Sequence, residues 1–120
     1  MWVHHLALRT DDVSKLAAFY EEIVGLRVEA RNLPRSIWLR AGETLVMVEL
    51  CSPDEPGIAT RSMELVAFSV DASERDSARA RLAGAGVPIE DETGFTMYFR
   101  DPDGRRIALS HYPVERNYRA

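Results

Sequence analysis

The chain has 120 residues, which is typical of one domain and too short for two ordinary ones. Hydrophobic residues make up 46% and charged residues 28%, so the composition excludes a disordered or a disulfide-stapled chain. The net charge of −4 disfavours nucleic acid as a partner, and no apolar run reaches the roughly 18 residues of a membrane span. The single cysteine, Cys51, permits no internal disulfide, and we expect a cytoplasmic location.

The first half of the chain predicts a strand, a helix and three further strands. Residues 2–9 alternate in polarity and contain β-forming residues, which is typical of a strand. Apolar residues recur at helical spacing over 13–24, and Gly25 fits the position just past a helix end. The three strands that follow are expected at 26–30, 36–40 and 44–50.

The second half repeats this pattern after a linker. Residues 51–62 contain two prolines and one glycine, which predicts a connecting segment. A second helix is predicted to begin with a capping box formed by Ser73 and Asp76 and to end near Ala83. The strands of this half are expected at 64–70, 87–90, 96–100 and 105–111.

The order strand, helix and three strands therefore occurs twice, and the two halves align by residue type. With an offset near 60, residues 37–40 match residues 97–100, and Glu49 matches Ala108. We therefore expect an α+β fold in which two βαβββ modules form a curved eight-stranded sheet, a cup, with the helices outside. The predicted organisation is one domain, 1–120, with modules at 1–50 and 63–112, the linker at 51–62 and a tail at 113–120.

Strand parity predicts which side chains face into the cup. The helices should cover the more uniformly apolar set of each strand and leave the other set inside. The turn at 101–104, with its proline and glycine, suits a type I turn with a glycine bulge and places Arg100 opposite Arg106. With the repeat, the expected ligand-binding residues are Trp38, Arg40, Met47, Tyr98, Arg100 and Arg106.

Four segments carry a family resemblance and together span nearly the whole chain. They read HHLALRTDDVSKLAAFYEEIVGLRV, LVMVEL, LVAFSV and MYFRDPDGRRIAL. They combine a strand with a histidine, a helix that ends in G-L-x-V and a late DPDG hairpin. With these segments the chain resembles the vicinal oxygen chelate superfamily, the group of glyoxalase I, extradiol dioxygenases, fosfomycin-resistance enzymes and bleomycin-resistance proteins.

The resemblance implies where a metal would bind. The family's metal sites draw on four inward positions, one each on the first, fourth, fifth and eighth strands, and typical ligands are His or Glu. His5 matches the first position and Glu49 the second, whereas Leu65 and Ala108 stand at the third and fourth. Two donors hold a divalent ion weakly, because catalytic sites usually supply at least three protein ligands. The resemblance therefore implies no firm cofactor, and at most a weakly held divalent metal on His5 and Glu49.

Two functions from different classes follow. The favoured hypothesis is a binding protein without obligatory metal, which holds an organic ligand in the cup as bleomycin-resistance members of the family do. The alternative is a metal-dependent lyase, isomerase or dioxygenase of the glyoxalase type, in which Glu49 takes the catalytic proton beside the metal. A metal-free variant would use Glu49 or His5 as a general base next to a carbonyl.

The inward charges predict the kind of ligand, and the edges of the sheet predict the oligomeric state. The inward set contains several arginines against one carboxylate, Glu49, which predicts an anionic small organic ligand. A curved sheet built from two small modules has open edges, which predicts a homodimer. The family commonly pairs such chains, sometimes so that one cup takes strands from both.

Overall fold

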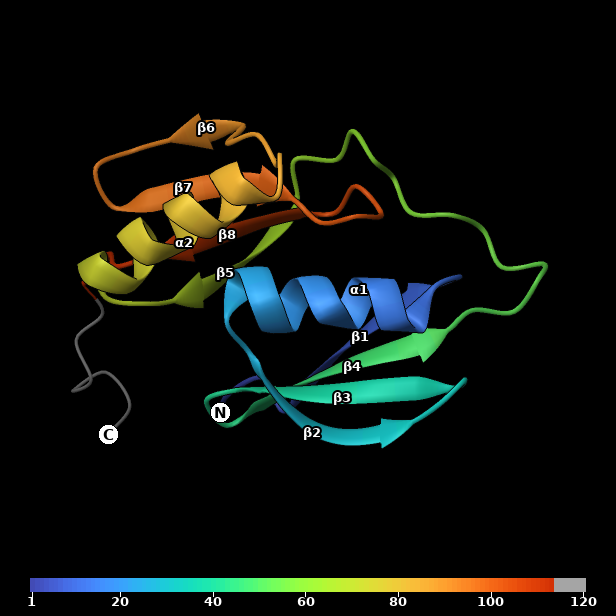
Figure 1. The fold of residues 1–120 in the computed structure, drawn as a ribbon. Coiled ribbons are helices and arrows are strands. Elements are labelled where there is room, and N and C mark those ends of the chain that lie inside the picture. The colour runs from blue at the N-terminus through green and yellow to red at the C-terminus, as the bar shows by residue number, and fades with distance from the viewer. Residues whose placement is uncertain (114–120) are drawn as a thin grey trace.

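The computed structural model describes residues 1–113, so the predicted tail lies outside the described residues apart from Pro113. The first module holds β1 (His5–Thr10), α1 (Val13–Phe19), the π-helical turn η1 (Tyr20–Val24), β2 (Arg27–Asn32), β3 (Ser36–Ala41) and β4 (Thr44–Leu50). The second holds β5 (Leu65–Ser69), α2 (Ala72–Gly84), β6 (Asp91–Glu92), β7 (Thr96–Arg100) and β8 (Arg106–Ser110) (Figure 1). Within 1–113, no helix is long and apolar enough to cross a membrane.

The eight strands form two sheets of four. Sheet A has the order β1-β4-β3-β2, and sheet B has the order β5-β8-β7-β6. In each sheet the first strand of the module runs parallel to the last, and the remaining pairs are antiparallel. The predicted α+β fold of two βαβββ modules is confirmed. The two sheets remain separate at β1 and β5 and do not close into a barrel.

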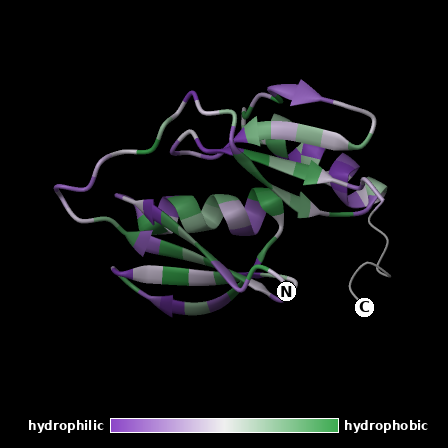
Figure 2. Ribbon diagram, turned by 180° about the vertical axis from the view of Figure 1, so that it is seen from behind, coloured by the Kyte–Doolittle hydropathy of each residue, from purple (hydrophilic) through white to green (hydrophobic). Residues whose placement is uncertain are grey.

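One hydrophobic core joins the two modules. Buried side chains from α1, η1, β3 and β4 cluster with others from α2, β7 and β8. The end of the first helix reaches sheet B, because the ring of Phe19 lies 6.2 Å from that of Phe99 and the ring of Tyr20 lies 6.4 Å from that of Phe68. Figure 2 shows the hydrophobic colouring along α1 and along the strands around it.

The helix boundaries follow local capping. Gly25 adopts the left-handed conformation (φ 98°) that the sequence predicts after the first helix. The capping box of α2 is formed by Asp71 and Glu74, so its prediction at Ser73 and Asp76 is wrong by two residues. The Asp71 carboxylate accepts from the Glu74 N–H at 2.8 Å, and the Ser73 hydroxyl donates to the same oxygen instead of capping by itself.

The observed strand bounds differ most from the predicted ones where apolar residues pack on the core without joining a ladder. The strand predicted at 87–90 is found at Asp91–Glu92, because Val87 and Ile89 pack against the core and Pro88 between them has no N–H for a ladder. The hairpin between β7 and β8 has the predicted register, with Arg100 opposite Arg106.

Candidate functional site

The face of each sheet opposite the helices is termed the open face. On β4, Val46 and Val48 are fully buried toward the helices, whereas Met47 between them points the other way and is half-buried. The ladders place Trp38 beside Met47 on this face and Tyr98 beside Ala108. The predicted parity of these strands is therefore confirmed.

The ladders correct the repeat alignment of β4 with β8. In sheet B, Ala108 lies opposite Tyr98. In sheet A, the residue opposite Trp38, the repeat partner of Tyr98, is Met47. Met47 is thus the equivalent of Ala108, and the predicted match of Glu49 with Ala108 is wrong by two residues.

The parallel ladders also show that β4 and β8 are aligned two residues away from the predicted match. His5 pairs with Leu45 of β4, whereas Leu65 pairs with Arg106 of β8. Leu45 is therefore the equivalent of Arg106, which lies two residues before Ala108. The physical reason is loop length: the predicted match required a β7–β8 connection one residue shorter than the β3–β4 connection, whereas it is one residue longer, which makes the difference two residues.

The four positions at which the family resemblance implies metal ligands are thus occupied by His5, Met47, Leu65 and Ala108. Only the imidazole of His5 is an ordinary donor for a divalent ion, since a thioether prefers soft metals and the other two side chains have no donor. Among residues 1–113 no three His, Cys, Asp or Glu side chains lie close enough to hold an ion. This donor set does not fit a divalent metal.

His5 and Glu49 lie on the same open face but are not in contact. Glu49 pairs with Arg9 of β1, four residues beyond His5, which separates the two Cα atoms by about 13 Å along the strand direction. The Glu49 carboxylate lies 3.7 Å from the Arg9 guanidinium. The His5 Nδ1 atom lies 3.0 Å from the Nδ1 atom of His4.

On sheet B, two of the predicted ligand-binding arginines share one carboxylate. Arg100 Nε lies 2.6 Å and Arg106 Nε 2.8 Å from the Glu90 oxygens. The hydrogen bond from Arg100, followed by that from Arg106, lowers the pKa of Glu90 to about 2. The Arg106 guanidinium also stacks 4.3 Å over the ring of Tyr98. The three charges sum to +1.

Arg100 has a further partner in the linker. Its Nη1 group donates to the carbonyl oxygens of Thr60 (3.1 Å), Ser62 (3.0 Å) and Gly104 (3.2 Å). Every guanidinium nitrogen of Arg100 therefore donates to a protein group. This geometry makes Arg100 an anchor that holds the linker against the β7–β8 turn.

On sheet A, Arg9 and the predicted ligand-binding residue Arg40 are also paired. Arg9 donates to Glu55 at 2.8 Å, and this hydrogen bond lowers the pKa of Glu55 to about 2. Arg40 pairs with Glu29, whose pKa is lowered by that hydrogen bond. Glu49 was the only inward carboxylate that sequence reasoning counted. The others were missed because Glu29 sits at a β-bulge and Glu55 and Glu90 lie outside the strands.

Trp38 on sheet A has a buried N–H group without a partner in the described part of the chain. The indole Nε1 of Trp38 is buried and, among the described residues, has no hydrogen-bond acceptor. Trp38 lies next to Met47 in the β3–β4 ladder. A bound acceptor atom would satisfy this N–H.

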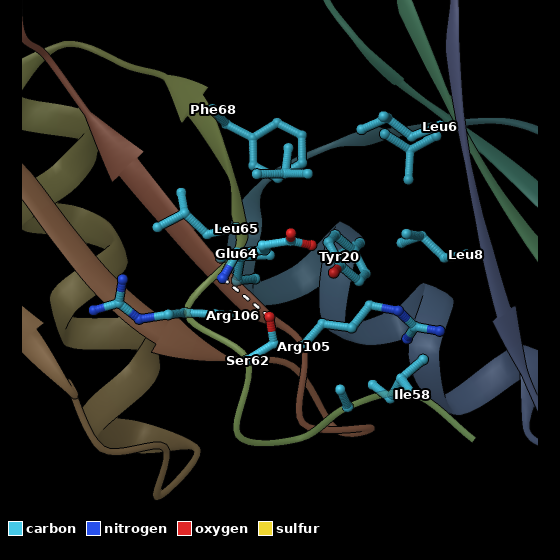
Figure 3. Close-up of a pocket in the computed structure, with 14 residues that line it drawn as sticks. Leu6, Leu8, Tyr20, Ile58, Ser62, Glu64, Leu65, Phe68, Arg105 and Arg106 are labelled. Atoms are coloured by element: carbon cyan, nitrogen blue, oxygen red, sulfur yellow. Dashed lines mark hydrogen bonds between the residues drawn. The ribbon is translucent and has the colours of Figure 1, made fainter. Parts of the chain in front are cut away.

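A cavity of about 330 Å³ lies between the two sheets, mostly on the helix side, and Leu65 and Arg106 of the open face reach it (Figure 3). Its walls come from β1, β4, β5, β8, η1, the β7–β8 turn and the linker. Of the predicted ligand-binding residues, only Arg106 lines it. Sequence reasoning did not find this cavity, because the parity of its apolar side chains assigned them to the core. The lining residues are Leu6, Leu8, Tyr20, Val46, Ile58, Ala59, Ser62, Glu64, Leu65, Val66, Phe68, Arg105, Arg106 and Ile107.

Comparison with known proteins finds one matching family and similar proteins. The family described as Glyoxalase/Bleomycin resistance protein/Dioxygenase superfamily matches residues 2–109. Glutathione transferase FosA of Serratia marcescens is 31% identical over 114 residues, which cover 89% of this chain and 78% of that protein. Metallothiol transferase FosB of Shouchella clausii is 26% identical over 116 residues, with 89% and 77% covered.

Solved structures share the fold. The fosfomycin resistance protein FosX of Listeria monocytogenes superposes with a TM-score of 0.76 at 19% identity, covering 99% of this chain and 96% of that one. A mutant of that protein, solved with Mn(II) and 1S,2S-dihydroxypropylphosphonic acid, gives 0.76 at 20% identity, with 98% and 97% covered. Lactoylglutathione lyase of Agrobacterium tumefaciens gives 0.70 at 19% identity, with 91% and 92% covered.

Proposed function

Because the chain belongs to the Glyoxalase/Bleomycin resistance protein/Dioxygenase superfamily, we propose that it binds a small organic ligand on its open face without depending on a divalent metal. The donor set at the four family positions carries this proposal. His5 supplies one imidazole, and Met47, Leu65 and Ala108 supply no hard donor. A catalytic divalent ion needs about three protein ligands, so binding rather than metal chemistry is the function these residues support.

Aromatic and thioether side chains supply the contact area for the ligand. Trp38 and Met47 lie side by side on sheet A, and the unpaired indole N–H of Trp38 offers a hydrogen bond to an acceptor atom. On sheet B, the ring of Tyr98 is held by the stacked guanidinium of Arg106. Arg40 and Arg100 flank these residues, each paired with a carboxylate.

We propose that the ligand is anionic. The cluster of Arg100, Arg106 and Glu90 carries an excess of one positive charge, and Arg106 is only 7% exposed at its side chain. A carboxylate or phosphonate placed against this cluster gains a charge-assisted hydrogen bond where water is largely excluded. The phosphonic acid in the solved FosX complex supports the same chemistry.

We further propose that the protein is a homodimer. Each sheet ends in two strands, β1 and β2 in sheet A and β5 and β6 in sheet B, whose outer backbone groups lack a ladder partner among the described residues. Proteins rarely leave such edges uncovered, because they template pairing with other chains.

A metal-dependent enzyme is the second candidate. His5 keeps the imidazole expected at the first ligand position, and the FosX structure solved with Mn(II) belongs to a relative of the same fold. In this alternative Glu49 is the catalytic base and second ligand. The separation of about 13 Å between the Cα atoms and the Arg9 contact both have to change for His5 and Glu49 to share one ion.

Isothermal titration calorimetry distinguishes the two candidates. The probes are small carboxylates and phosphonates, each paired with its neutral amide or alcohol, titrated into chelator-treated protein. We expect the anions to bind more tightly than their neutral partners, and Arg106→Met to weaken them about tenfold. Arg31→Met is the matched control, because Arg31 lies on β2 with a side chain that is 55% exposed. Binding or turnover that is lost with chelator and restored by Mn(II) would support the metal enzyme instead.

A further inference from the structure

The cavity on the helix side has apolar walls and a size suited to a small molecule. Leu6 and Leu8 of β1 lie across it from Phe68 of β5, the ring of Tyr20 lies between them in the view (Figure 3), and Val66 of β5 also lines it. These four aliphatic and aromatic side chains on the strands are only partly buried. A volume of about 330 Å³ lies within the range of small-ligand sites.

The linker closes one side of this cavity. Ile58 and Ala59 contribute to the wall, and the segment that carries them is tied down at both ends. Glu55 pairs with Arg9, and Arg100 holds the carbonyl groups of Thr60 and Ser62. The cavity is therefore bounded by a fixed segment rather than by a free loop.

Three of the polar groups around the cavity are satisfied by protein partners. The Tyr20 hydroxyl donates to Asp101 at 2.7 Å. Arg105 pairs with Asp101 at 3.3 Å and with Asp103 at 3.1 Å. Arg106 pairs with Glu90 at 2.8 Å. The charge of Arg105 is therefore neutralised by its two aspartates, whereas Arg106 shares the Glu90 carboxylate with Arg100.

Glu64 differs from these groups. Its backbone N–H donates to the Ser62 hydroxyl at 3.1 Å, and its carboxylate extends into the cavity toward Tyr20 in Figure 3. Within residues 1–113 this carboxylate makes no hydrogen bond and no ion pair. The cavity thus combines an apolar body with one negative charge that has no counter-ion from the described chain.

We propose that this cavity is a second ligand site, which takes a small apolar molecule that ends in a primary ammonium group. The hydrocarbon part packs between the β1 and β5 side chains, and the ammonium group donates to the Glu64 carboxylate. The cavity shares Arg106 with the open-face cluster, but Glu64 lies outside that cluster, so Glu64→Gln tests this site and leaves the open-face cluster intact. Either proposal can therefore fail while the other holds.

The test uses benzylammonium, benzyl alcohol and benzoate as probes, titrated into the full chain and followed by protein NMR shifts. We expect benzylammonium to bind roughly tenfold more tightly than benzyl alcohol and benzoate to bind least. Glu64→Gln should bring benzylammonium to the affinity of the alcohol and leave the alcohol unchanged. Glu43→Gln is the matched control, because Glu43 is an exposed carboxylate in the β3–β4 turn. Ala59→Phe should weaken both probes by filling the cavity.

Two results overturn the proposal. One is equal affinity for benzylammonium and benzyl alcohol in the wild-type protein, or a preference that Glu64→Gln leaves intact. The other is a failure of both probes to bind, together with a dimer that Leu8→Asp converts to a monomer. The second result would mean that another copy of the chain fills the cavity.

Discussion

The hydroxyl of Tyr20 donates a 2.7 Å hydrogen bond to the carboxylate of Asp101, which lies 81 residues away in the sequence. Tyr20 is 1% exposed and Asp101 is 4% exposed. Asp101 also accepts from the backbone N–H groups of Asp103 (2.9 Å) and Arg105 (3.0 Å). Burial, followed by the charge of Asp101, raises the pKa of Tyr20, so its hydroxyl remains a donor. One hydrogen bond thus joins η1 of the first module to the β7–β8 turn of the second.

Removal of this donor should destabilise the protein. We expect Tyr20→Phe to lower the free energy of unfolding by about 1.5–3 kcal/mol, because a buried carboxylate loses one of its partners. Urea unfolding measures this change. Tyr112→Phe is the control, since Tyr112 is 64% exposed and its substitution should stay within about 0.5 kcal/mol. Equal stability of the two variants would contradict the assignment.

Gly104 should tolerate substitution less well than Gly42. Both have positive φ, 92° and 59°, so an added Cβ strains either backbone by about 1–2 kcal/mol. At Gly104 the Cβ would also lie 2.8 Å from Thr60 Cγ2, whereas nothing lies within 4 Å at Gly42. Gly104→Ala should therefore lower the melting temperature more than Gly42→Ala. A smaller effect at Gly104 would mean that the linker does not dock on this turn.

The Glu90 pairs should contribute a pH-dependent stability. Because the pKa of Glu90 falls from 4.5 to about 2 on folding, its contribution is present above about pH 4.5 and is lost as the pH falls toward 2. The difference in unfolding free energy between the wild type and Glu90→Gln should therefore be largest near neutral pH and shrink in acid. Urea unfolding between pH 2 and pH 7 follows this. A difference that is constant across this range would contradict the pairing.

The purified protein should carry no stoichiometric divalent metal after dialysis. The reason is the single ordinary donor, His5, at the four family positions. Elemental analysis of protein produced in metal-replete medium measures the content. The double substitution Leu65→His and Ala108→Glu should raise it toward one equivalent, because it restores three donors. One equivalent of Zn, Ni, Mn or Fe in the wild type would contradict this expectation.

The chain should sediment as a dimer at micromolar concentration. The open edges of both sheets are the reason, because uncovered strands pair with other chains. Analytical ultracentrifugation gives the mass directly. A monomer at the same concentration would show that the edges are protected in some other way.

Alternation of polarity predicted the strands well where it is strong. Strands β4 (Thr44–Leu50) and β7 (Thr96–Arg100) have the predicted bounds, since both alternate between buried and half-buried side chains. The strand expected at 87–90 failed because its apolar residues pack on the core without a ladder. The apolar content of a segment predicts that its side chains are buried. Strand pairing also needs a neighbouring strand whose backbone N–H and C=O groups are free.

The candidate site was harder to predict than the fold. Parity correctly placed Trp38 and Tyr98 on the open face, because it needs only local alternation. The partners of Arg106 and Arg9 are Glu90 and Glu55, which lie in loops whose three-dimensional path no periodicity encodes. The alignment of Glu49 was wrong for a related reason, since the length of the β7–β8 turn sets the register of the whole strand and differs by two residues from what that alignment required.

The position of the first helix has a consequence for folding cooperativity. Phe19 and Tyr20 belong to the first module by sequence, yet their rings pack against Phe99 and Phe68 of the second. If the modules separated, each would expose apolar surface that only the other covers, and Asp101 would lose the hydrogen bond from Tyr20. The two halves are therefore duplicates in strand order but not autonomous folding units. They should melt in a single transition.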